Sequence, residues 1–183
     1  ARPVRGADAA VTALLEIERL EVSFGATAAV RGASFTVAPG ETHCLVGESG
    51  CGKSVTALAV MNLLARGARR SARRLTFQGE DLTGLSDAGM ARLRGNAMAM
   101  IFQEPMTSLN PAYTVGSQMT EVLRRHKKAS RRVATDRAAD LLARVGITAP
   151  GLRLGQFPHQ LSGGLRQRVM IAMALMCDPQ LLI

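Results

Sequence analysis

Residues 47–54 read Gly47-Glu48-Ser49-Gly50-Cys51-Gly52-Lys53-Ser54. This octapeptide matches the pattern G-x-x-x-x-G-K-[ST], the phosphate-binding loop that joins a strand to a helix. Its glycines let the backbone wrap around an anion, and the helix that follows directs the positive end of its dipole at the same point. The stretch therefore predicts a triphosphate site in which Lys53 contacts the β- and γ-phosphates and Ser54 binds Mg²⁺.

The flanking sequence supplies the strand and the helix that this loop requires. The short apolar run at 43–46 predicts a strand, and apolar residues from Leu58 to Ala65 predict a helix. Before them, the alternating residues of 17–37, interrupted by glycines, predict antiparallel strands. Further strands are expected at 75–77 and 97–102, with a helix from about Ser86 to Gly95 between them.

Beyond Pro111 the pattern becomes helical, with helices expected at 115–125, 133–145 and 163–176. The predicted fold is α/β: a P-loop NTPase (RecA-like) core with an antiparallel β segment and an inserted α-helical subdomain. Residues 1–14 are expected to form a disordered lead-in. Residues 15–183 are expected to form one domain, in which residues 112–176 are a mostly helical subdomain. A strand beginning at Leu181 suggests that the sheet is incomplete at the C-terminus.

Composition narrows the class of protein. The chain has 183 residues, 47% of them hydrophobic, with three cysteines in neither metal-ligand nor redox-pair spacing, which fits a reducing cytoplasm. Its longest apolar run, 169–177, is about half of a bilayer span, so any membrane role is expected to be peripheral. The net charge of +9 is concentrated in clusters at 69–74 and 124–132. Because neither cluster contains Phe, Tyr or Trp, they predict a solvated or lipid-facing surface rather than a nucleic-acid site.

A second glycine-bearing turn lies roughly 110 residues beyond Lys53. It reads Leu161-Ser162-Gly163-Gly164, followed by Leu165-Arg166-Gln167-Arg168. Ser162 is suited to cap the helix that follows, and the two glycines allow an anion to approach its first N–H groups. The segment is thus a candidate second phosphate site.

Together these motifs resemble those of the ABC ATPase family, whose LSGGQ-type signature the second turn matches. The stretches 101–111 and 158–175 look like the branch that imports dipeptides, oligopeptides, glutathione and nickel, with Leu165 where that branch commonly has Met. The resemblance implies a head-to-tail dimer in which Ser162, Gly163 and Gly164 contact the ATP held by the partner. It also implies that Gln103 is the Q-loop residue, close to Mg²⁺ and the attacking water, and that Phe24 stacks on adenine. An inward-facing core role for Phe24 remains an equal alternative.

The resemblance further implies three partners: integral-membrane permease subunits, a second nucleotide-binding domain and, indirectly, a solute-binding protein. It also implies that this subunit is peripheral, at the cytoplasmic face of the cell membrane. In the family, carboxylates for Mg²⁺ and water follow the strand that begins at Leu181. None is present before the chain ends at Ile183, so the fragment is expected to hydrolyse ATP poorly. Two alternatives stay open: a soluble ABC ATPase acting on nucleic acid or ribosomes, and a truncated, non-catalytic interaction module.

Overall fold

The computed structural model describes residues 13–103 and 108–183. The predicted lead-in at 1–14 lies almost entirely outside these residues, although Leu14 is buried and its N–H bonds the carbonyl oxygen of Val37 at 2.8 Å. The chain divides into two compact units, Ala1–Met90 and Ala91–Ile183, called here the N-terminal and C-terminal units.

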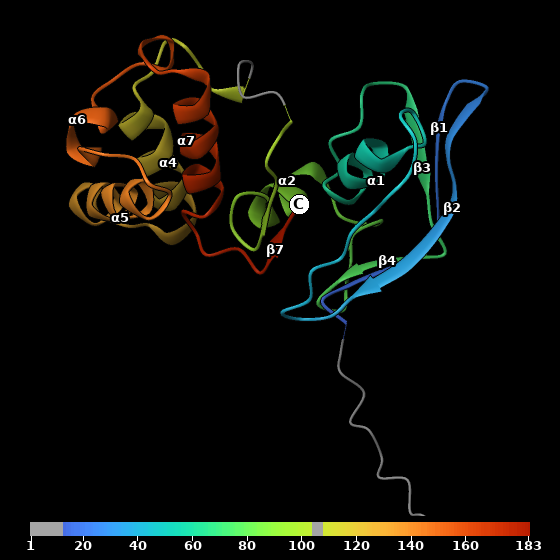
Figure 1. The fold of residues 1–183 in the computed structure, drawn as a ribbon. Helices are drawn as coiled ribbons and strands as arrows, with labels where there is room; N and C mark the ends of the chain where they lie inside the picture. Colours follow the sequence, from blue (N-terminus) through green and yellow to red (C-terminus); the bar gives the residue numbers. More distant parts are fainter. Residues whose placement is uncertain (1–12, 104–107) are drawn as a thin grey trace, which may run out of the picture. The chain divides into compact units, whose positions relative to one another are not determined.

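The N-terminal unit is built on an antiparallel sheet (Figure 1). Strand β1 (Leu15–Phe24) pairs with β2 (Thr27–Val37) along one edge, and with both β3 (Ala68–Ser71) and β4 (Arg74–Phe77) along the other. A short β5 (Glu80–Asp81) extends the sheet beyond β4. The antiparallel segment expected from the alternation at 17–37 is confirmed.

A bulge in β1 keeps its apolar residues on one face. Leu15 and Ile17 are buried, as are Leu20 and Val22, so the spacing changes from two residues to three at Arg19. Arg19 has a positive φ of 50°, and the pairing register shifts between Ile17 and Leu20. The extra residue therefore restores the inward direction of Leu20, which a regular strand would turn outward.

Helix α1 (Lys53–Val60) lies against the sheet and buries Ala59 and Val60 (Figure 1). It ends before Asn62, whose φ of 51° is left-handed, so the helix is shorter than the apolar pattern predicted. Strand β3 was not predicted from its Arg-rich sequence. Arg70 faces inward there and donates to the carbonyl oxygens of Ala59, at 2.6 Å, and Leu82, at 3.1 Å, which ties β3 to α1. Burial lowers the pKa of Arg70, and the charge of Asp81 opposes that shift.

The strand predicted at 43–46 is wrong for this structure. No strand is assigned there, and Leu45 and Val46 are 42% and 89% exposed. A central strand of a parallel sheet needs hydrogen-bonded neighbours on both sides. The described part of the N-terminal unit offers only antiparallel strands, which are already paired with one another.

The C-terminal unit contains a parallel pair of short strands. These are β6 (Met98–Ala99) and β7 (Leu181–Leu182), and the N–H of Ile101 continues the ladder to the carbonyl oxygen of Ile183 at 2.8 Å. Strands expected near 97–102 and from Leu181 are thus confirmed, although β6 is shorter than predicted. Helix α2 (Asp87–Leu93) precedes them and crosses the boundary between the units.

In the described part of the C-terminal unit, four helices pack around the core (Figure 1). They are α4 (Val115–Lys127), α5 (Arg131–Arg144), α6 (Pro150–Leu154) and α7 (Gly163–Ala174), with a 3₁₀ turn η1 (Pro158–Gln160) before α7. The three longer helices are confirmed, whereas α6 is too short to show a helical period. In the part of the chain that the structure describes, no helix has both the length and the apolar character needed to cross a membrane.

Candidate nucleotide-binding site

The side chain of Lys53 is held inside the loop that precedes α1. Its ammonium donates to the carbonyl oxygens of Gly47 and Glu48, both at 2.7 Å, and lies 3.5 Å from the Sγ atom of Cys51. Three successive parts of the loop thus surround one positive charge. The Cys51 contact was not foreseen, because any residue fits that position of the motif.

Two glycines of the loop stand where a side chain would collide. A Cβ atom on Gly52 would lie 2.5 Å from the carbonyl oxygen of Ala29 on β2, and the residue has a left-handed φ of 94°. On Gly47 a Cβ atom would lie 2.6 Å from the Cys51 Sγ atom. The loop is therefore closely packed on its sheet side, and its conformation depends on glycine at these positions.

The N-terminus of α1 is suited to an anion. Its N-cap residue, Gly52, provides no side-chain oxygen, so no side chain caps the helix. Within the described residues, the only loop N–H with a backbone acceptor is that of Cys51, which bonds the carbonyl oxygen of Glu48 at 3.3 Å. Unpaired N–H groups, a helix dipole and the Lys53 ammonium form a complementary cradle for phosphate.

Exposed residues complete this face of the loop. Glu48, Ser49, Gly50 and Ser54 are exposed, so the Ser54 hydroxyl at the start of α1 is accessible to a metal ion. Among the described residues no group of three or more His, Cys, Asp or Glu side chains is arranged to hold a metal. The oxygen of Ser54 together with phosphate oxygens is the kind of donor set that Mg²⁺ accepts.

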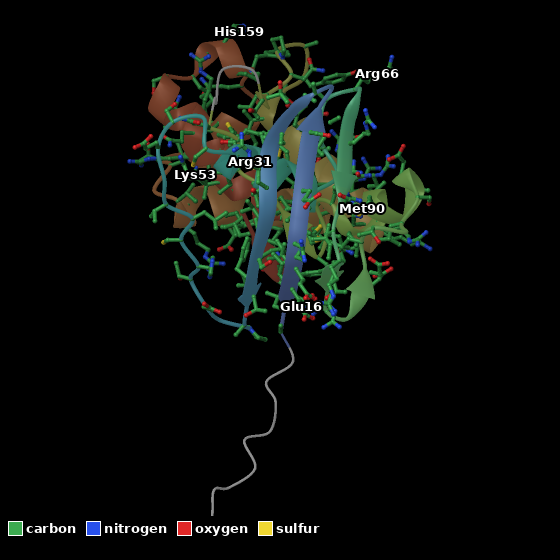
Figure 2. All side chains as sticks on the ribbon, turned by 90° about the vertical axis from the view of Figure 1, so that its right-hand side faces the viewer. Glu16, Arg31, Lys53, Arg66, Met90 and His159 are labelled. Carbon is green, nitrogen blue, oxygen red and sulfur yellow. The ribbon has the colours of Figure 1, made fainter. Side chains whose placement is uncertain are left out.

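A hollow of about 460 Å³ adjoins the loop. Lys53 and Arg31 both line it, and Figure 2 labels them on this unit. The ring of His43 stacks on that of Phe35 in its wall, with centroids 4.8 Å apart. Phe24, the candidate for adenine stacking, ends β1 and is 37% exposed, so it is not a fully buried core residue.

The second glycine turn opens α7 as the sequence suggested. Ser162 is its N-cap, and the hydroxyl oxygen accepts from the N–H of Leu165 at 3.3 Å. Gly163 and Gly164 are exposed, with no atom within 4 Å of a Cβ atom built on either. Leu161 is buried at 4% exposure, so its side chain anchors the turn in the core. The turn therefore presents open backbone at a helix N-terminus.

Gln160 fixes the entry to this turn, a role that the sequence analysis missed. Its side-chain oxygen accepts from the N–H of Phe157 at 2.8 Å, which closes η1. The sequence pattern that could have predicted this bond is a glutamine three residues after the N-cap position.

Gln103 follows β6 in the C-terminal unit and is exposed. The next part of the predicted Q-loop, 104–107, lies outside the described residues. The Gln118 side chain of α4 holds residues 110–113 through three hydrogen bonds. It accepts from the N–H of Asn110 and donates to the carbonyl oxygens of Asn110 and Tyr113, each at 2.9 Å. Gln118 was not singled out from the sequence.

Two features define a nucleotide-binding cassette. One is the glycine loop with its lysine at the start of a helix, in a unit built on an antiparallel sheet. The other is the glycine turn whose serine caps a helix of the helical unit. The chain belongs to the ABC transporter family, whose sequence model matches residues 30–183.

Relatives within the family are named for peptide transport. The chain is 51% identical to the dipeptide transport ATP-binding protein DppD of Bacillus subtilis over 175 residues, which cover 93% of this chain and 52% of DppD. It is 51% identical to the oligopeptide transport ATP-binding protein OppD of the same organism, over 94% of this chain and 50% of OppD. Identity to DppD of Escherichia coli is 49%, covering 93% and 54%. The chain thus spans about half the length of these relatives.

Solved structures share the fold. A dimeric bacterial ABC transporter cassette, MJ0796, superposes with a TM-score of 0.80 at 22% identity, covering 92% of this chain and 72% of that one. CbiO1 of Clostridium perfringens, part of an ABC transporter complex, gives a TM-score of 0.73 at 24% identity, covering 93% and 64%. The predicted fold class is therefore confirmed.

Proposed function

We propose that this chain is the ATP-binding part of a transporter subunit that powers the import of peptides or similar small solutes. The observation that carries the proposal is the Lys53 ammonium, held within the glycine loop beside an uncapped helix N-terminus. The peptide-transport names of relatives at 49–51% identity support the type of solute.

In this proposal, loop 47–54 binds the phosphates of ATP. Lys53 donates to the β- and γ-phosphate oxygens, the unpaired N–H groups of the loop and of α1 surround them, and Ser54 is a ligand of Mg²⁺. The metal ion supplies positive charge that offsets the charge of the phosphates. Phe24, whose ring is partly exposed, stacks on the adenine.

The C-terminal unit serves the nucleotide of a second subunit. Ser162, Gly163 and Gly164 contact the γ-phosphate held by that partner, whether it is an identical chain, a related subunit or a second domain. The open space around both glycines supports this role. Gln103, exposed after β6, orients the attacking water and links the nucleotide to the membrane subunits.

The remaining partners follow from the same proposal. ATP binding closes the dimer, hydrolysis resets it, and the movement drives integral-membrane permease subunits. A solute-binding protein delivers the solute to those permeases and acts on this subunit only indirectly. The subunit is then peripheral, at the cytoplasmic face of the membrane.

Reconstitution tests the proposal. The full-length protein, assembled with permease subunits encoded beside it in proteoliposomes, should take up a dipeptide only when Mg-ATP is supplied on the side of this subunit. Lys53→Ala should abolish uptake while leaving the assembly intact. Uptake without ATP, or uptake unaffected by this substitution, would contradict the proposal.

A further inference from the structure

The end of α4, the turn that follows it and the start of α5 together carry the densest charge of the C-terminal unit. Six cationic residues, Arg124, Arg125, Lys127, Lys128, Arg131 and Arg132, occur within nine positions, and all are exposed. Here they are called the basic hairpin. No Asp or Glu lies between residues 122 and 135. Among the described residues, the only ion pair that the hairpin makes is between Arg132 and Asp136, at 3.8 Å on a highly exposed surface. Five of the six charges thus remain uncompensated.

A hollow of about 500 Å³ lies against this hairpin, between α4, α5 and α6. Two of the basic residues, Arg124 and Arg131, line it from different helices, together with Ser117. Neither guanidinium has a hydrogen-bond or ion-pair partner among the described residues. The hollow is therefore a shaped site in which neither guanidinium is paired: the one carboxylate of its lining, that of Glu121, makes no ion pair with them among the described residues.

The polar groups of the hollow divide into donors and acceptors. The donors are the two guanidiniums and the Ser117 hydroxyl. Thr120 and Thr135 already donate their hydroxyl protons to backbone carbonyl oxygens, of Gly116 at 2.7 Å and of Arg131 at 2.9 Å, so their oxygens are left as acceptors. Glu121 adds a carboxylate with no ion-pair partner among the described residues. A ligand must therefore combine an anion with hydroxyl groups.

We propose that the hollow and the basic hairpin bind the surface of an anionic membrane through a phosphatidylglycerol-type headgroup. The phosphodiester bonds Arg124 and Arg131, whose planar guanidiniums match phosphate oxygens in pairs. The headgroup hydroxyls donate to Glu121 and to the threonine oxygens. The surrounding cations attract the net negative charge of the bilayer.

Nucleic acid is the competing polyanion, and the hairpin fits it less well. Residues 121–135 contain no Phe, Tyr or Trp on which a base could stack. A negatively charged carboxylate, Glu121, also lies in the hollow, where a phosphate backbone offers it no hydroxyl donor unless the strand is RNA. The proposal does not involve the phosphate-binding loop, because Lys53 belongs to the other unit.

Vesicle binding tests the proposal with the purified protein. Vesicles of phosphatidylglycerol in phosphatidylcholine should bind the protein, and pure phosphatidylcholine vesicles should not. Arg124→Gln with Arg131→Gln should lower the affinity roughly thirtyfold, since each basic residue near an anionic surface contributes about 1 kcal/mol. The matched control, Arg66→Gln with Arg69→Gln, removes two exposed charges from the N-terminal unit and should change the affinity less than threefold.

Two further variants test whether vesicle binding depends on the geometry of the hollow, on charge alone or on the nucleotide site. Arg124→Lys with Arg131→Lys keeps the charge but loses the planar fork, and it should still bind several-fold more weakly than the unaltered protein. Lys53→Ala should bind vesicles normally. The proposal is overturned if the lysine variant binds vesicles as tightly as the unaltered protein, or if the control loses as much vesicle affinity as the glutamine variant. It is also overturned if soluble glycerol phosphate binds as tightly as the vesicles, or if RNA or DNA displaces the protein from the vesicles at equimolar phosphate.

Discussion

The ammonium of Lys53 donates to the carbonyl oxygen of Gly47 at 2.7 Å, across the full width of the loop. The two residues are the first glycine and the lysine of the motif, so this hydrogen bond joins the two ends of the loop. Backbone carbonyl oxygens thereby hold the lysine charge within the loop, and because an ammonium has only three donors, β- and γ-phosphate oxygens must replace part of these hydrogen bonds.

Lys53→Ala should consequently weaken both the nucleotide and the loop. We expect ATP affinity to fall by about 10- to 100-fold, since hydrogen bonds to charged groups contribute about 1.5–3 kcal/mol. Amide hydrogen exchange at 47–50 should become faster, because two bonds across the loop are lost. A fluorescent nucleotide titration and exchange measurements check these outcomes. Lys127→Ala, on the basic hairpin, serves as the charge control and should alter neither.

Gly52→Ala should destabilise the N-terminal unit, because its methyl group would press on the Ala29 carbonyl oxygen at a left-handed φ. A side chain in such a conformation costs about 1–3 kcal/mol. The free energy of unfolding from urea titration measures this loss. A value unchanged within about 0.5 kcal/mol would show that the loop rearranges freely.

Gly164→Ala makes the matching test at the other glycine turn. A methyl group there meets no atom within 4 Å, and alanine favours a helix by up to about 1 kcal/mol, so stability should hold or rise. The added methyl would nevertheless occupy the space through which a partner's phosphate approaches the helix. ATP-dependent dimerisation, followed by light scattering, should therefore decrease. Unimpaired dimerisation would place the phosphate elsewhere.

Ser162 has two roles that substitutions can separate. Ser162→Ala removes the bond from the Leu165 N–H and should cost about 1 kcal/mol of stability. Ser162→Asp keeps a side-chain oxygen that caps well, so stability should be retained, but its negative charge repels a phosphate. Thermal unfolding and ATPase activity of the assembled transporter distinguish the roles. Full activity in the Asp variant would restrict Ser162 to capping.

His126 provides a pH-dependent contribution to stability. Burial lowers the pKa of His126, and the charges of Arg125 and Lys127 lower it further. The folded protein therefore binds this proton less readily than the unfolded chain, whose histidine pKa is about 6.5. The contribution of neutral His126 to the free energy of unfolding should be fully present above about pH 6.5. It should be lost progressively as the pH falls from there toward the lower pKa of the folded state.

Urea unfolding as a function of pH, compared between the unaltered protein and His126→Gln, measures this contribution. The difference between the two proteins should change as pH falls through the histidine range. A parallel pair of curves would contradict the prediction. Phosphatidylglycerol vesicles should raise the pKa of His126, since the basic hairpin beside it would then face anions, and NMR titration checks that shift.

The extent to which sequence predicted this protein varies with the range of the interactions involved. The loop at 47–54, the cap at Ser162 and the three longer helices depend on contacts within a few residues, and all are visible in the pattern of residue types. The antiparallel strands also follow from local alternation. Strand β3 and the bulge at Arg19 were missed, because β3 pairs through an Arg-rich segment and the bulge matters only when a neighbouring strand fixes the register.

By itself, the sequence determined the phosphate-binding loop, the second glycine turn and the family to which they belong. Only the tertiary structure decided that Lys53 is bound by Gly47 and Glu48, that Gly52 faces the Ala29 carbonyl oxygen, and that Arg124 and Arg131 line one hollow. It also showed residues 43–46 without a strand partner. The physical reason is that a motif specifies which groups are available, whereas distances between atoms depend on side chains and strands brought together from distant parts of the chain.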